Sequence, residues 1–351
     1  MATSVKDVPP ILHLPDELLL QVVSKINGDD RRTTLRYLAL THSRFRPIAT
    51  EVLVRNAVVP VRSIAKYLTL LEQHSEWIPR IRSVEFRDEG PPFFFSTSAR
   101  SHRMCLAMVR KLLADFEADE IDAFFERERN SASLWLVLIL AVLNKSETLI
   151  IDSQSTLGFS DFLPILAVPT TLDGTNFFYF ALLEVMRHEL RALTITTPAH
   201  NSELRKLTFI QFRFLKLLTI MGDLLEIKGS RQVERILPQS LEELNIFSDH
   251  DTHIWRFLSD LYLARTNTDN FYHLRQVQLC FNASCRSMAN YANIHLSHRL
   301  PVRTILGEWK KCNTLFETAF HVRGKPRFKL DSYRQSCLLD EIEAVEEELG
   351  R

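Results

Sequence analysis

The sequence predicts an α/β fold with a small all-α part at its N-terminus. Residues 12–54 contain three short apolar segments with helical periodicity, and short β-branched runs then alternate with helix-like runs over most of the chain. Several of the strand-like runs recur at a similar spacing. Because 46% of the residues are apolar and 25% are charged, as in ordinary globular proteins, we expect most of the chain to be folded.

The first apolar segment, LPDELLLQVVSKI (14–26), predicts an amphipathic helix. Pro15 suits the first helical position, where its missing N–H would have no partner. Asp16 and Glu17 place negative charge at the positive end of the helix dipole. At about 100° per residue, the residues that share the apolar side are Leu18, Leu19, Val22, Val23 and Ile26.

Two further helices are predicted before residue 55. TTLRYLAL has Thr33 as a candidate cap, and SRFRPIATEVL has Ser43 as a candidate cap with Pro47 in its first turn. Three such short helices have too little interior to bury all their apolar faces on one another. Part of this surface must therefore meet either residues 55 onward or a separate chain.

The segment LHLPDELLLQVVSKI, followed by LRYLALTHSRFRPIA, resembles an F-box, the short helical module that docks on the Skp-type adaptor of cullin-based (SCF) ubiquitin ligases. The features that match are the Leu-Pro-x-Glu-Leu opening, the Leu-Ala-Leu core and the Ser-Arg-Phe-Arg segment. The resemblance implies an adaptor-binding surface made of Leu14, Pro15, Leu18, Leu19, Val22, Ile26, Leu40 and Phe45. The alternative is that these residues only pack against residues 55 onward.

Seven strand-like runs follow, at residues 55–61, 81–86, 147–152, 190–196, 215–221, 241–247 and 274–281. Their equivalent positions are Val58, Val84, Leu149, Leu193, Leu218, Leu244 and Val277, at intervals of 26, 65, 44, 25, 26 and 33 residues. Three intervals match the length of a leucine-rich repeat. This irregular pattern after an F-box resembles a group of fungal F-box proteins, which implies a leucine-rich-repeat-like solenoid of strands and helices.

The longer intervals contain additional helix-like runs, at residues 104–116, 134–143 and 177–186. The run LWLVLILAVL (134–143) is too short to cross a membrane, which takes about 20 residues, and is expected to be a buried helix. A helix is expected over residues 304–320 and a last strand over 319–330. The predicted division is a flexible N-terminus (1–11), the F-box (12–54), the repeat region (55–330) and an acidic helix or tail (331–351).

Composition argues against several classes of function. Forty-three basic residues balance forty-three acidic ones, so no overall field attracts nucleic acid or an anionic membrane. The five cysteines are odd in number and scattered, which favours free thiols in the cytoplasm or nucleus.

No motif predicts a catalytic residue, a cofactor or a metal site. The segment SDHDTHIW collects Asp249, His250, Asp251 and His253, but a polar loop before the next helix is the preferred interpretation over a metal site. Cys280 and Cys285 lack the spacing of a zinc ribbon.

Three consecutive aromatic residues, Phe93, Phe94 and Phe95, cannot all face one side of a regular element. They are either a loop that folds back onto the repeats or a contact for a protein client.

The function expected from the resemblance is a non-catalytic substrate receptor of an SCF ligase, with a Skp-type adaptor, a cullin and an unknown client as partners. The alternative is a protein-binding scaffold outside any ligase.

Overall fold

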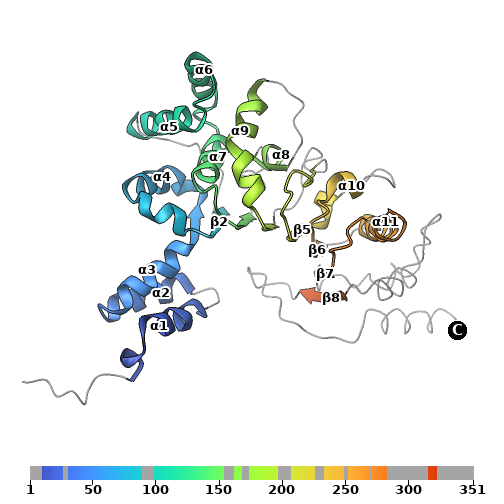
Figure 1. Cartoon of the computed structure of the whole chain (residues 1–351), viewed down its shortest axis with the longest axis horizontal. Helices are drawn as coiled ribbons and strands as arrows, with labels where there is room; N and C mark the ends of the chain where they lie inside the picture. Colours follow the sequence, from blue (N-terminus) through green and yellow to red (C-terminus); the bar gives the residue numbers. More distant parts are fainter. Residues whose placement is uncertain are drawn as a thin grey trace, which may run out of the picture.

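The computed structural model describes residues 10–26, 31–88, 99–153, 162–167, 174–196, 207–225, 233–248, 252–268, 270–282 and 315–321. These residues form a mixed α/β structure, as the sequence predicts. Three helices at the N-terminal end precede a parallel sheet that is accompanied by further helices (Figure 1).

The three N-terminal helices are present, but their first residues differ from the prediction. A 3-10 turn, η2 (Pro10–His13), leads into α1 (Asp16–Ser24), which is followed by α2 (Arg31–Thr41) and α3 (Phe45–Arg55). Pro15 is the N-cap of α1, one residue before the position expected for it. Thr33 is not a cap, because α2 already begins at Arg31. Arg44, not Ser43, is the N-cap of α3.

One eight-stranded parallel sheet runs through the described part of the chain, with its strands in sequence order. Its strands are β1 (Asn56–Pro60), β2 (Ser83–Asp88), β3 (Thr148–Ser153), β4 (Ala192–Ile195), β5 (Leu217–Met221), β6 (Glu243–Ser248), β7 (Gln276–Asn282) and β8 (Leu315–His321). The first seven match the predicted strand-like runs. The helix expected up to residue 320 is wrong from Leu315 onward, because these residues form β8, in which Phe316 and Phe320 pair with Val277 and Phe281. The last strand expected over residues 319–330 therefore begins four residues earlier than predicted, and residues 322–330 lie outside the described part of the chain.

The repeated positions align in register across the sheet, with one exception. Val84, Leu149, Leu193, Leu218, Leu244 and Val277 pair in succession. In β1, however, Ala57 and not Val58 pairs with Val84, so the predicted equivalence of Val58 is wrong by one residue. The physical reason is that β1 follows α3 without a loop, and Ala57 and Val59 are the side chains that it buries.

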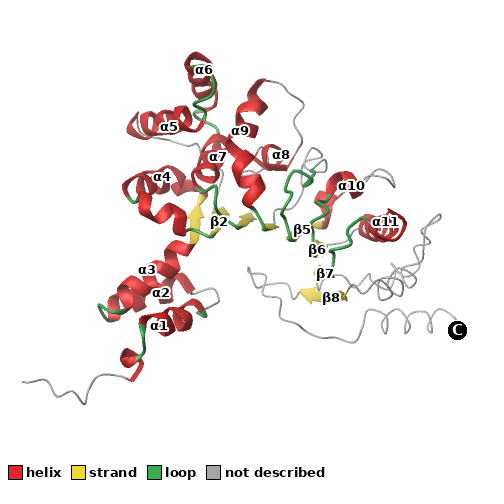
Figure 2. Ribbon diagram, viewed as in Figure 1, coloured by secondary structure: helices red, strands yellow, loops and turns green. Residues whose placement is uncertain are grey.

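Helices connect successive strands along one side of the sheet, and the strands line the inner side of the resulting curve (Figures 1 and 2). The first connections contain η3 (Val61–Ser63), α4 (Ile64–Gln73) and η4 (Ser75–Arg80), then α5 (Ala99–Leu112), α6 (Ala118–Glu128) and α7 (Ala132–Val142). The later ones contain α8 (Phe162–Ala167), α9 (Gly174–Glu189), η6 (Gly222–Leu225), α10 (Val233–Ile236) and α11 (Thr252–Thr268).

Helix α7 forms the centre of the main core, which confirms the predicted buried helix. Its residues from Ser133 to Ala141 are all buried. Ser131 caps the helix by accepting a hydrogen bond from the backbone N–H of Ser133 at 3.2 Å, and Trp135 Nε1 donates to the Arg129 carbonyl at 3.0 Å. Among the described helices, none combines the length and the apolarity that a membrane crossing requires.

The three N-terminal helices are joined to the sheet without a linker. Helix α3 ends at Arg55 and β1 begins at Asn56, whose side-chain amide donates to the Val52 carbonyl at 3.2 Å. Glu51 of α3 forms an ion pair with Arg55, at 2.7 Å between Oε1 and Nε, and another with Arg80 of η4. These contacts fix the direction of α3 relative to the first two strands.

The register of β1 predicts opposite outcomes for two neighbouring substitutions. Ala57→Asn places an amide in the core without a partner and should lower the free energy of unfolding by about 2–4 kcal/mol. Val58→Asn lies on the other face and should change it by less than about 1 kcal/mol. Urea unfolding followed by circular dichroism measures both, and equal losses would contradict the register.

Candidate protein-docking surface

The three N-terminal helices have a hydrophobic core of their own, separate from the core under the sheet. Helix α3 packs against both α1 and α2. Leu19 is 0% exposed and Phe45 is 7% exposed, so both residues hold the helices together and neither is available on the surface. The buried residues of this small core are Leu19, Val23, Leu35, Phe45, Ile48 and Val52.

The remaining residues predicted to bind the adaptor lie at or near the surface. Leu18 and Val22 are 44% and 49% exposed, and they are neighbours on α1 because they are four residues apart. Pro15 is exposed as well, whereas Leu14 and Ile26 are half-buried at the edge of the small core. The apolar side of α1 is therefore divided between the core and an open face.

Helix α2 carries a second exposed apolar face. Leu40, a predicted contact, is 81% exposed, and Tyr37, three residues earlier on the same face, is 65% exposed. Sequence reasoning missed Tyr37, although its spacing from Leu40 is a signal that could have identified it. Large apolar side chains this open on a small helical unit are typical of a protein-binding surface.

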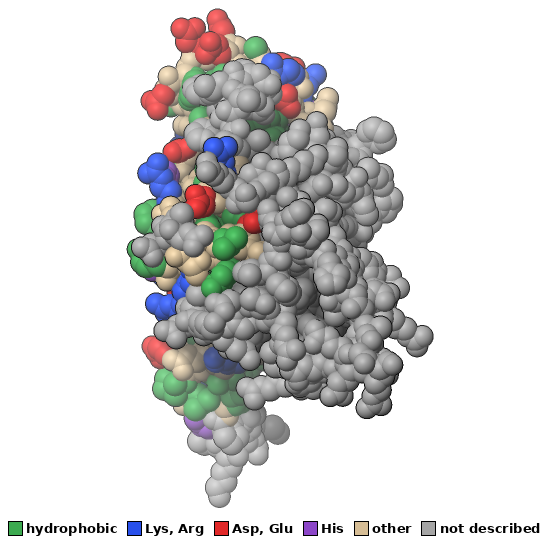
Figure 3. Space-filling model, turned by 90° about the vertical axis from the view of Figure 1, so that its right-hand side faces the viewer, with side chains coloured by type: hydrophobic (Ala, Val, Ile, Leu, Met, Phe, Trp, Pro, Cys, Tyr) green, Lys and Arg blue, Asp and Glu red, His purple; other side chains and the backbone are tan. Residues whose placement is uncertain are grey.

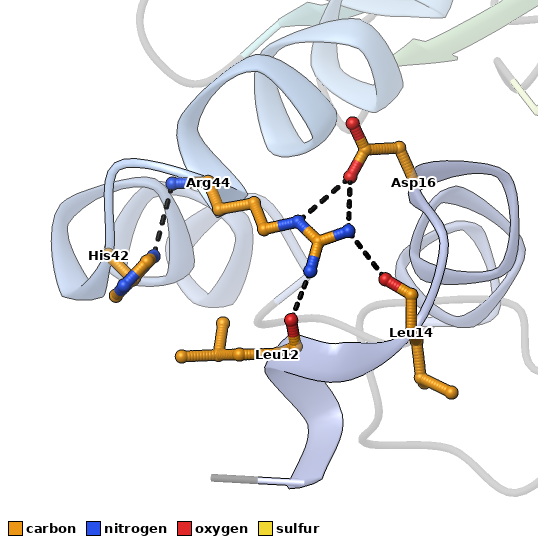
Figure 4. A network of polar contacts seen from close by, with 5 residues as sticks. All are labelled: Leu12, Leu14, Asp16, His42 and Arg44. Carbon is orange, nitrogen blue, oxygen red and sulfur yellow. Dashed lines mark hydrogen bonds and ion pairs between the residues drawn. The ribbon is translucent and has the colours of Figure 1, made fainter. Parts of the chain in front are cut away.

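Arg44 links the segment before α1 to the turn between α2 and α3 (Figure 4). Its Nε donates to Asp16 Oδ1 at 2.9 Å, Nη2 donates to the Leu14 carbonyl at 2.5 Å, and Nη1 donates to the Leu12 carbonyl. The planar guanidinium group can satisfy several acceptors at once in this way. Arg44 therefore fixes the position of Leu14 and Pro15 next to α1. Sequence reasoning missed this contact because it joins residues about thirty positions apart.

The face of the sheet turned away from the helices is a second candidate surface. Asn245 Nδ2 donates to Thr219 Oγ1 at 3.2 Å, and Thr196 donates from its hydroxyl to Asp152 Oδ1 at 2.9 Å. One row across this face, in register from β2 to β7, consists of Glu85, Ile150, Thr194, Thr219, Asn245 and Gln278. From β4 to β7 this row is polar and uncharged, which suits hydrogen bonding to a protein ligand.

The remaining candidates from the sequence contribute no described site. Phe93, Phe94 and Phe95 lie outside the described residues, as do Asp249, His250, Asp251 and Cys285. Within the described residues, no group of His, Cys, Asp and Glu side chains could hold a metal ion.

The described cysteine thiol, that of Cys105, is free and buried. Burial, and then the charge of Glu72, raise the pKa of this thiol to about 12. It therefore stays protonated at neutral pH, where a nucleophilic cysteine would need to be a thiolate.

Charged side chains of both signs are interspersed over the described surface that Figure 3 displays. No protein-family model matches the chain, and a search of curated proteins found no similar sequence.

The contacts of Arg44 predict a local effect of removing it. Arg44→Ala should release the segment before α1, because two backbone carbonyls and Asp16 lose a charged donor, at a cost of about 1–2 kcal/mol. Hydrogen exchange of the amides in residues 11–14 should become faster. Arg46→Ala, which removes an exposed arginine two residues away, is the matched control and should leave this exchange unchanged.

Proposed function

We propose that this chain is a substrate-receptor subunit of an SCF-type ubiquitin ligase. In this proposal the three N-terminal helices act as an F-box that docks on a Skp-type adaptor and, through it, on a cullin. The observation that carries the proposal is the exposed apolar surface of Leu18, Val22, Tyr37 and Leu40 on a helical unit that already has its own core.

The division of α1 supports a partner on its open side. Leu19 and Val23 are buried in the small core, whereas Leu18 and Val22 remain exposed next to them. Helix stability alone does not require apolar residues at the two exposed positions, since polar residues would keep the helix soluble at no cost in packing. Burial against a separate chain gives these side chains a role.

The second half of the proposal concerns the sheet. Parallel strands in sequence order, with connecting helices along one side, support a leucine-rich-repeat-like solenoid. The side-chain row that runs from Glu85 to Gln278 would then line the concave face and contribute to client binding. Phe93, Phe94 and Phe95 stay candidates for the same role.

The proposed mechanism is proximity. An adaptor held on α1 and α2, and a client held on the sheet, would share a fixed geometry because α3 continues directly into β1. Such an arrangement raises the effective concentration of a client lysine near a charged ubiquitin-conjugating enzyme, and it requires no catalytic residue in this chain. The proposal places the protein in the cytoplasm or the nucleus.

A double substitution on α1 tests the proposal. Leu18→Asp with Val22→Asp should abolish co-purification with a Skp-type adaptor, because two charges would enter an apolar interface. Val185→Asp with Leu263→Asp is the matched control, since these side chains are comparably exposed (51% and 38%) on α9 and α11. Unchanged adaptor binding by a folded α1 double variant would contradict the proposal.

Recovery of the cullin distinguishes the ligase from the alternative function. A ligase subunit should be recovered from cells with both the adaptor and the cullin. A scaffold that uses the adaptor only for stability should be recovered with the adaptor alone. Loss of both partners in the α1 double variant would show that the cullin is recruited through the adaptor.

A further inference from the structure

Residues 31–50 are strongly basic although the chain as a whole has no net charge. This segment, which contains all of α2 and the first half of α3, has no Asp or Glu. Its basic residues are Arg31, Arg32, Arg36, Arg44 and Arg46. The positive charge of the N-terminal helices is therefore concentrated on the two helices that follow α1.

Three of these arginines are exposed and form no ion pair with any described residue: Arg32, Arg36 and Arg46. Two exposed arginines elsewhere, Arg82 and Arg110, are paired within the chain. Arg82 contacts Glu147 at 3.1 Å, and the side chain of Arg110 contacts Asp122. The described part of the chain thus supplies no acidic partner for these three arginines.

The positions of these arginines oppose helix stability. Arg32 lies in the first turn of α2 and Arg46 in the first turn of α3, and neither turn contains an acidic residue. The amino end of a helix dipole is positive, so the charges of Arg32 and Arg46 are unfavourable there. A contribution to binding accounts for their presence better than a contribution to folding does.

Two of the unpaired charges, those of Arg32 and Arg36, lie on the same helix as the exposed apolar side chains of α2. Arg32, Arg36 and Leu40 are spaced four residues apart, so they form one ridge along the outer side of α2, with Tyr37 adjacent to it. A partner that covers Leu40 must also approach Arg36. The surface thus combines an apolar centre with a basic border.

We propose that the partner surface that covers Leu40 and Tyr37 is an apolar groove bordered by carboxylates, which pair with Arg32 and Arg36. This inference rests on the proposed function and specifies the chemistry of the adaptor face that α2 meets. A protein fits the observations better than a nucleic acid does, because a phosphate backbone would leave the 81% exposed Leu40 without an apolar contact.

The test measures binding of the full-length chain to a purified Skp-type adaptor at two salt concentrations. Arg32→Glu with Arg36→Glu should weaken binding roughly tenfold at about 50 mM salt, mainly through slower association, and much less at about 500 mM salt. Arg103→Glu with Arg213→Glu makes the same change of charge at two exposed arginines of α5 and of the segment before β5, and should bind within about twofold of the unaltered chain.

The outcomes separate this inference from the proposed function. One outcome is that the unaltered chain binds the adaptor while the Arg32 and Arg36 variant binds as the control does at both salt concentrations. In that case the inference of a carboxylate border is wrong, and the proposal of adaptor docking is unaffected. If the unaltered chain does not bind the adaptor, both proposals fail. Binding of a short duplex DNA that the same variant loses, with adaptor affinity unchanged, would assign these two arginines to nucleic acid and overturn the inference.

Discussion

Helix α3 packs against two separate hydrophobic cores, and the arrangement of the whole chain depends on this double contact. Phe45, Ile48 and Val52 complete the small core of the N-terminal helices, whereas Val54, one residue before the helix ends, belongs to the core under the sheet. The chain then enters β1 without a loop. Movement of the N-terminal helices relative to the sheet would have to disrupt one of the two cores.

This constraint explains why an apolar surface remains open. The small core buries only one side of α1 and α2, and the core under the sheet buries only the end of α3. Leu18, Val22 and Leu40 are therefore left exposed by the described part of the chain. Because α3 packs against both cores, whatever docks on these residues is held at a defined angle to the sheet. A separate adaptor and a client held by one chain would need this geometry.

Much of the fold was predictable because it depends on local patterns. Alternating apolar residues identified seven strands, and their spacing predicted most of the register. Ala57 was missed because the phase of β1 is set by the end of α3, which periodicity alone does not report. The last strand, expected from residue 319, begins earlier, at Leu315, because pairing with β7 decides the conformation of this segment.

The candidate docking surface was only partly predictable. Helical periodicity placed Leu18, Leu19, Val22 and Val23 on one apolar side, but which of them the small core buries depends on how α3 packs. Hydrogen exchange of the full-length chain with and without a purified Skp-type adaptor tests the account most directly. Docking of the adaptor on α1 and α2 should slow exchange in these two helices and leave exchange in β3 to β6 unchanged. Protection confined to the sheet, with α1 and α2 unchanged, would contradict it.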